Sequence, residues 1–374
     1  MFHYLKKSIS NIICYIALKK ENFFYNLGLR KAISKYSSFL SEGTYELLTG
    51  SDRKKIFYLR NNSTLKFICD HKQNLARHKQ NIFVVLVDSL FKLKIVKSEC
   101  QKFLGHLLLL TYNKDIKIFD FNNHQVLTIY HDKEKFILVE SAFKNLNPFF
   151  NFTDIYFSYN NFYQIEHLIC QKCYEQLSKY EKDYVFQKII LQYTEYFRQT
   201  DHRLLQRVIP EELCKELEKK IPKSVRLRIE RILLTPNFRN ISFPRVFLHG
   251  DLNSGNIFAD GEQVKMIDLE HAGNFVFIYD IFYLISYEAI ARNNFFLLKE
   301  YCNGMYDDLL LNLFSQLGMV YDANTKIKYV AVVLAERLLN VGISRNPMIG
   351  SPGSPKRNDS LLLLNEIERL YFDR

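Results

Sequence analysis

VFLHGDLNSGNIFADGEQVKMIDLEHAG, residues 246–273, is the segment that decides the fold of this chain. Its first residues, 246–248, are apolar and predict a short strand. That strand leads into the polar residues 249–251, which we expect on a loop. Residues 253–255 are Asn, Ser and Gly, all turn formers, so the chain is expected to double back directly after the loop.

Two short apolar stretches follow this loop, at residues 257–259 and 264–267. They flank Asp260-Gly261, a dipeptide that strongly favours a tight turn between antiparallel strands. In such a hairpin the residues just outside the two strands face one another. We therefore expect Asn256 and Asp268 side by side at the open end.

The polar residues of this segment have the chemistry of a magnesium site. Asp251, Asn256 and Asp268 supply hard oxygen donors, which magnesium prefers when water and substrate phosphates complete its shell. One carboxylate can stay off the metal and accept a proton from an attacking hydroxyl, and phosphoryl transfer requires little more of a protein. The alternative is a polar turn whose Asp and Asn only cap backbone groups, but turn chemistry alone does not require the second Asp.

HGDLNSGN followed by IDLE resembles the aminoglycoside phosphotransferase and choline kinase family, relatives of the protein kinases. The resemblance implies that Asp251 is the catalytic base and that His249 braces the catalytic loop. It implies that Asn256 and Asp268 bind Mg2+ and that the nucleotide is ATP. By the same resemblance, Asp280 is a buried support for the loop.

The resemblance also raises the question of an acidic residue after the metal Asp, a phosphate loop and a hinge strand. Glu270 follows the metal Asp where an acidic residue is common in the family, and a supporting role is expected. No glycine-rich phosphate loop is evident, and Gly50-Ser51 is a weak substitute for one. A strand at 136–139, ending at Glu140, is the candidate for the hinge whose backbone contacts adenine.

The family also has a strand lysine that contacts the nucleotide phosphates and pairs with a helix glutamate. We assign this role to Lys66 in STLKFI, although the helix expected after it offers His78 where the acid should lie. Lys117, on a later strand, with Glu166 as its partner is the competing assignment. Either lysine can instead be a solvated strand residue.

Strand and helix patterns are segregated along the chain. Strands are expected at 45–49, 55–60, 64–68, 116–121, 126–130 and 136–139, with mainly helix at 71–110, 160–240 and 277–345. The resulting expectation is an α+β, bilobal protein-kinase-like fold. Its parts are a helical extension (1–42), a strand-rich nucleotide-binding lobe (43–146) and a helical lobe with the catalytic loop and acceptor site (147–374).

Net charge, cysteine usage and the length of apolar runs indicate which partners and which compartment to expect. The net charge of +11 favours anionic ligands. The chain has no compact run of basic residues, so we do not expect nucleic acid among these ligands. Seven cysteines, odd in number and mostly isolated, suit a reducing compartment, so we expect a cytoplasmic protein. No apolar run is long enough to span a bilayer. The amphipathic N-terminal segment leaves peripheral membrane contact open.

Two functions follow from these observations. The first is an ATP- and Mg2+-dependent kinase that phosphorylates a hydroxyl of a small polar acceptor, with a sugar of a cell-envelope glycan as a candidate. The second is a non-catalytic module that binds Mg2+-nucleotide. The complete set of Asp251, Asn256 and Asp268 favours the first, because a binding module needs no base.

Overall fold

The computed structural model describes residues 37–48, 55–59, 93–95, 103–111, 114–160, 162–169, 171–201, 203–261, 263–341 and 359–372. The chain divides into two compact units, and each is built from two segments. Unit 1 comprises Met1–Asp132 with Ile155–Leu168, and unit 2 comprises Lys133–Asp154 with Ile169–Arg374. Unit 1 is rich in strands and unit 2 is mainly helical, which confirms the expected α+β class.

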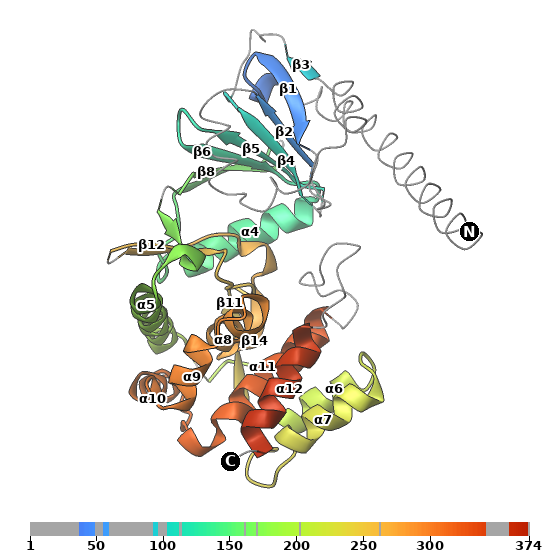
Figure 1. The fold of residues 1–374 in the computed structure, drawn as a ribbon, viewed down its shortest axis with the longest axis vertical. Coiled ribbons are helices and arrows are strands. Elements are labelled where there is room, and N and C mark those ends of the chain that lie inside the picture. Colours follow the sequence, from blue (N-terminus) through green and yellow to red (C-terminus); the bar gives the residue numbers. More distant parts are fainter. Residues whose placement is uncertain are drawn as a thin grey trace, which may run out of the picture. The chain divides into compact units, whose positions relative to one another are not determined.

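Unit 1 contains one eight-stranded antiparallel sheet in the order β3-β1-β2-β4-β5-β6-β8-β7 (Figure 1). The strands are β1 (Gly43–Leu48), β2 (Lys55–Leu59), β3 (Leu93–Ile95), β4 (Leu107–Leu110), β5 (Ile116–Asp120), β6 (Gln125–Ile129), β7 (Ile155–Ser158) and β8 (Tyr163–His167). A short 3-10 helix, η1 (Ser37–Phe39), precedes β1.

Alternation along β5 and β6 builds the core of unit 1. Ile116 and Ile118 of β5 lie on one face with Leu127 and Ile129 of β6, and all four are buried in one apolar cluster. Because side chains alternate across a strand, Lys117 lies on the opposite face. This alternation is the feature that made the two strands predictable from sequence.

The side chain of Asp120 closes the turn between β5 and β6. Asp120 accepts hydrogen bonds from the backbone amides of Asn122 and Asn123, at 2.9 and 3.0 Å. A carboxylate that bonds the amides two and three residues ahead closes a tight turn. These two bonds close the turn at Asn122-Asn123, which joins β5 to β6.

Residues 136–139, expected to be a strand, lie inside helix α4 (Lys133–Leu146). The buried residues Phe136, Val139 and Ala142 recur every three positions, which is the spacing of one helix face. A short run such as Phe-Ile-Leu-Val does not by itself distinguish a strand from a buried helix segment. The hinge-strand interpretation of this segment is wrong.

Two other helix predictions are also wrong in part. Residues 163–167 form strand β8 instead of a helix, and β8 pairs with both β6 and β7. Residues 107–110 form strand β4, within a segment expected to be mainly helical. The expected strand at 64–68 and the N-terminal helix up to residue 36 lie outside the described residues.

Unit 2 combines helices with two three-stranded sheets, β10-β11-β14 and β13-β12-β9. Its strands are β9 (Lys172–Cys173), β10 (Arg207–Val208), β11 (Phe243–Leu248), β12 (Ile257–Asp260), β13 (Gln263–Met266) and β14 (Gly273–Val276). Besides α4, its helices are α5 (Lys179–Arg198), α6 (Pro210–Leu217), α7 (Lys223–Leu233), α8 (Tyr279–Ala291), α9 (Phe296–Cys302), α10 (Asp307–Ser315), α11 (Lys326–Val341) and α12 (Asp359–Phe372). The 3-10 helices are η3 (Tyr174–Gln176), η4 (Leu269–His271) and η5 (Ala323–Thr325).

Helix α8 is the buried helix of unit 2. It is apolar on nearly every side, and it packs against α9, α11 and α12. A helix that is hydrophobic all round belongs in the interior of a protein. Within the described part of the chain, no helix is both long and apolar enough to cross a bilayer.

Candidate functional site

The loop between β11 and β12 is closed by its own hydrogen bonds. The carbonyl oxygen of Asp251 accepts from the Asn253 amide at 2.8 Å and from Asn256 Nδ2 at 2.9 Å. The Asn253 side chain accepts from the Gly255 amide at 2.8 Å, and its carbonyl accepts from the Asn256 amide at 3.0 Å. The turn formers in this segment therefore fix the spacing between Asp251 and Asn256.

Asp280, on the first turn of α8, holds the backbone of this loop from inside the protein. Its carboxylate accepts from the amides of His249 and Gly250, both at 2.9 Å, and from the Tyr193 hydroxyl at 2.5 Å. Burial raises the pKa of Asp280, while these donors oppose that shift. The carboxylate lies against the loop, as the supporting role expected of Asp280 requires.

Gly250 is required by the path of the loop. Its φ of +79° lies in the left-handed region, and a Cβ here would lie 2.1 Å from the carbonyl oxygen of His271. A side chain is therefore excluded by both dihedral strain and collision. The close approach brings the loop against the segment that carries Asp268.

The imidazole of His249 links the loop to the end of the β12–β13 hairpin. His249 is buried; its Nε2 lies 2.8 Å from the carbonyl oxygen of Ile267, and its Nδ1 accepts weakly from the Asp251 amide at 3.4 Å. This pattern needs a neutral ring with the proton on Nε2. His249 thus connects the backbone of Asp251 to the residue before Asp268.

Asp251 and Asn256 are in contact through their side chains. Asn256 Nδ2 lies 3.4 Å from Asp251 Oδ2, in addition to its bond with the Asp251 carbonyl. Because the amide nitrogen is occupied in this way, the amide oxygen of Asn256 is left for another partner. That arrangement fits a residue expected to offer oxygen to a cation.

The predicted hairpin of β12 and β13 is confirmed. Ala259 pairs with Val264 and Ile257 with Met266, and the Ile267 amide bonds to the carbonyl of Asn256 at 3.0 Å. Asp268 is therefore the residue immediately after the one opposite Asn256. Its φ of 69° and ψ of 67° are left-handed, a conformation that Asp tolerates better than most residues.

Glu270, two residues beyond Asp268, forms an ion pair with Lys135 of α4. Both side chains are largely shielded from solvent, with exposed fractions of 15% for Lys135 and 24% for Glu270. The pair fastens η4 to α4. Sequence reasoning expected a supporting role for Glu270 but did not identify Lys135, because α4 was interpreted as a strand.

Tyr283 is a further residue at the site that sequence reasoning missed. Its hydroxyl donates to Asp251 Oδ1 at 2.8 Å. Tyr283 follows Asp280 by three residues on α8, so the helix directs both side chains to the same loop. That spacing was the available signal, but it becomes informative only once 279–291 is known to be one helix.

Lys66 and Lys117 are the two lysines considered for contact with the nucleotide phosphates. Lys66 and His78 lie outside the described residues, as does Gly50-Ser51. Lys117 is on β5 opposite Thr128, whereas Glu166 is on β8 in the row of Val126, so the two share a face of the sheet but not a row. Glu166 belongs to a strand, and a helix glutamate at this position is therefore excluded.

The donor set fits a metal that uses few protein ligands. Among the residues that the structure describes, no group of three or more His, Cys, Asp or Glu gathers into a metal cage. One amide and one or two carboxylates suit magnesium, which keeps water and phosphate oxygens in its shell.

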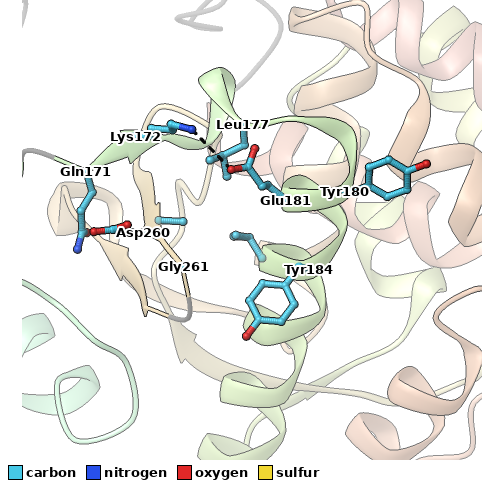
Figure 2. A pocket seen from close by; sticks show the side chains of 10 residues that line it. Gln171, Lys172, Leu177, Tyr180, Glu181, Tyr184, Asp260 and Gly261 are labelled. Atoms are coloured by element: carbon cyan, nitrogen blue, oxygen red, sulfur yellow. Dashed lines mark ion pairs between the residues drawn. The ribbon is translucent and has the colours of Figure 1, made fainter.

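A cavity of about 450 Å³ lies at the closed end of the same hairpin (Figure 2). Asp260 and Gly261 of the turn line it together with Lys172 and the α5 residues Glu181 and Tyr184. Lys172 and Glu181 form an ion pair at 3.6 Å across it. None of the expected catalytic or metal-binding residues lines this cavity, so we do not assign it to the reaction.

Comparison with known proteins adds to this geometry. Residues 185–302 match the phosphotransferase enzyme family. The match covers less than half of the chain but contains Asp251, Asn256, Asp268 and Asp280. It confirms the resemblance inferred from HGDLNSGN and IDLE, and it supports a kinase-type phosphotransferase.

Solved structures similar to this chain include three kinases. They are a choline/ethanolamine kinase family protein from Mesorhizobium loti (12% identity, 70% of this chain, 87% of that one, TM-score 0.44), an ethanolamine kinase from Plasmodium vivax (17%, 70%, 81%, 0.43) and choline kinase LicA from Streptococcus pneumoniae (14%, 68%, 91%, 0.41). No curated protein sequence matches this chain significantly.

Proposed function

We propose that this protein is an ATP- and Mg2+-dependent phosphotransferase that moves the γ-phosphate to a hydroxyl of a small polar acceptor. The observation that carries the proposal is the fixed contact between Asp251 and Asn256 on a loop whose backbone is held by Asp280. A turn that only capped backbone groups would not need a buried carboxylate to hold two of its amides.

In the proposed reaction, Asp251 accepts the proton of the acceptor hydroxyl. The oxygen of that hydroxyl bonds to the γ-phosphorus at the same time. The bond from that phosphorus to the bridging oxygen breaks, and ADP leaves with the electron pair. Asn256 and Asp268 would hold Mg2+, which neutralises phosphate charge when bound. His249 keeps the base and the metal Asp on one framework. Lys66 is the proposed contact to the nucleotide phosphates.

The tyrosines of α8 bear on the acceptor. Arg337 lies over the Tyr283 ring at 4.7 Å and Arg292 over the Tyr287 ring at 5.6 Å. One face of each ring near Asp251 is therefore already occupied by a cation, whereas recognition of a quaternary ammonium group uses free aromatic faces. We therefore favour a sugar hydroxyl, as in a cell-envelope glycan, over a choline-like acceptor.

The proposed enzyme works in the cytoplasm, where ATP is available and isolated thiols stay reduced. Its partners are ATP and the acceptor, without nucleic acid. The net charge of +11 agrees with anionic ligands and with contact at an acidic membrane surface, where envelope precursors are assembled.

Replacement of the proposed base tests the function directly. Asp251→Asn should lower turnover by about 10²- to 10⁴-fold, because proton acceptance is lost, while the affinity for Mg2+-ATP changes little. Asp268→Ala should instead weaken Mg2+-ATP binding. Turnover is measured as ADP release with amino alcohols, amino sugars and envelope glycans as acceptors, and binding by calorimetry.

Two results would contradict this assignment. Full activity in both variants would show that the residues are wrongly chosen. Tight Mg2+-ATP binding by the unmodified protein, without turnover with any acceptor or with water, would favour the non-catalytic nucleotide-binding module.

A further inference from the structure

Helix α8 sends two side chains to the catalytic loop. Asp280 bonds the loop backbone at His249 and Gly250, and Tyr283 bonds the carboxylate of Asp251. Residues three apart on a helix lie on the same face, so one rigid element controls both the path of the loop and the orientation of the proposed base.

We infer that Tyr283 is a positioning residue, whose hydroxyl fixes the Asp251 carboxylate in the orientation used for proton acceptance. The inference rests on the proposed function and extends it, because it names a group that acts through the base without touching the phosphates. Tyr283 is not part of the HGDLNSGN or IDLE motifs.

The tyrosine is held firmly enough for this role. Its side chain is only 5% exposed, and its ring is nearly parallel to that of Tyr279, at 5.7 Å between centroids and 8° between planes. The guanidinium of Arg337 lies over the ring at 4.7 Å. Burial raises the pKa of Tyr283 well above its ordinary value, so the hydroxyl keeps its proton and remains a donor.

The two oxygens of Asp251 are held unequally. Oδ1 accepts from Tyr283 at 2.8 Å, whereas Oδ2 has only the long 3.4 Å contact with Asn256 Nδ2. Asp251 is half-buried, so the carboxylate is still reachable. With Oδ1 fixed by a buried donor, Oδ2 is the oxygen that takes the proton from the acceptor.

A competing explanation is that the Tyr283 hydroxyl occupies the position of the acceptor hydroxyl and is displaced when the acceptor binds. The tight packing of the ring between Tyr279 and Arg337 argues against displacement. The two explanations also predict opposite results. Loss of the hydroxyl slows the reaction if Tyr283 positions the base, and speeds it or leaves it unchanged if Tyr283 blocks the base.

The test compares two tyrosine-to-phenylalanine variants of the full-length protein. Tyr283→Phe removes the bond to Asp251, and Tyr301→Phe removes a similarly buried hydroxyl whose bond goes to the Lys326 carbonyl at 2.9 Å. ADP release from Mg2+-ATP is measured with water as the acceptor, so that no acceptor need be known. The KM for ATP and the thermal midpoint are recorded as well.

We expect Tyr283→Phe to lower kcat about ten- to a hundred-fold, the usual effect of losing one hydrogen bond to a charged group. The KM for ATP should stay within about two-fold, because nucleotide binding does not use the base. Tyr301→Phe should lower the thermal midpoint about as much as Tyr283→Phe does, but it should leave kcat unchanged.

Three results overturn the inference. An unchanged or increased kcat in Tyr283→Phe would remove the positioning role while the proposed function stands. An equal drop in both variants would reduce Tyr283 to a structural residue. Absence of turnover in the unmodified protein, both with water and with every acceptor tested, would overturn both proposals, since a base that is never used needs no positioning.

Discussion

Gly250 is the residue at which the smallest chemical change has the largest expected effect. Its left-handed φ and the nearby carbonyl of His271 leave no room for a Cβ. Gly261, in the turn of the β12–β13 hairpin, also has a positive φ of +56°, but a Cβ there would meet no atom within 4 Å. The two glycines thus separate dihedral strain from collision.

Gly261→Ala should lower the free energy of unfolding by about 1–2 kcal/mol, the cost of a left-handed alanine. Gly250→Ala should cost more, because its methyl group also collides with backbone, and it should reduce turnover as the loop shifts. Urea unfolding with ADP release measures both effects. Equal losses of stability in the two variants would show that the loop relaxes around the methyl group.

At this scale the path of the loop between β11 and β12 was predictable from the sequence. The turn that brings Asp251 and Asn256 together was predicted because its spacing is local and fixed by turn chemistry. The catalytic and metal-binding roles of His249, Asp251 and Asn256 stay predictions. Tyr283 and Lys135 were not found, because each reaches the site from a different element and depends on that element being a helix. Contacts made through tertiary packing leave little trace in local spacing.

Among the secondary-structure elements, α4 contacts η4, the short helix that begins directly after the proposed metal ligand Asp268. Lys135 and Glu270 form its ion pair, and Glu270 lies two residues after Asp268. A second lysine on α4, Lys144, pairs with Glu140 of the same helix at 2.8 Å and is 66% exposed. The two pairs differ in whether they connect α4 to the site.

Lys135→Met should weaken Mg2+-ATP binding about three- to ten-fold, because the segment after Asp268 loses its anchor. Lys144→Met should leave the Kd unchanged, since Lys144 is exposed and its ion pair stays within one helix, away from the site. Calorimetric titration of both variants with Mg2+-ATP gives the comparison. Similar affinity in both would show that the Lys135 pair does not position Asp268.

Glu336 connects helix α11 to the β10-β11-β14 sheet of unit 2. Its carboxylate accepts from the Val276 amide at 2.8 Å and pairs with Arg245 at 3.0 Å. Burial raises the pKa of Glu336 to about 6, the Val276 amide and Arg245 act in the opposite direction, and Glu216 adds to the rise.

This raised pKa has a defined effect on stability. Between pH 4.5 and 6 the folded state binds more protons at Glu336 than the unfolded state, so the free energy of unfolding falls as pH rises through that window. The loss is about 2 kcal/mol. Relative to the unmodified protein, Glu336→Gln should gain that amount between pH 4.5 and 7 in urea unfolding. A difference that does not change with pH would contradict the shift.

At the scale of the whole molecule, the chain leaves unit 1, returns to it and leaves it again. The chain crosses at residues 132–133, 154–155 and 168–169, so unit 1 takes its last two strands from beyond α4. β8 pairs with β6 along five residues, and Ile165 packs against the core of unit 1. The sheet is therefore complete only when the second segment has joined it.

Hydrogen exchange on the full-length protein can test this membership. Ile165→Ala should lower the stability of unit 1 by about 2 kcal/mol and speed amide exchange in β4, β5 and β6. Exchange in α8 should be unaffected. Leu284→Ala, in α8, should give the reverse pattern. Faster exchange throughout the protein in both variants would show that the two units unfold as one.

The order of strands and helices was only partly predictable at this scale. The hairpins 116–130 and 257–267 were recognised because turn residues join two alternating stretches. The return of the chain to unit 1 at 155–168 was not, because IEHLI also matches helical spacing and its strand pairing is with a distant segment. Non-local pairing therefore decided what local periodicity left ambiguous.

Because the loop depends on Asp280, its structure can form only late in the synthesis of the chain on the ribosome. Asp280 lies after the whole of HGDLNSGN and IDLE, so both motifs leave the ribosome before the residue that shapes their backbone. Until α8 has emerged and packed, His249 and Gly250 have no internal acceptor and Asp251 no tyrosine partner. A nascent or truncated chain that ends before Tyr279 would thus carry both motifs without the hydrogen bonds from α8 that hold the loop.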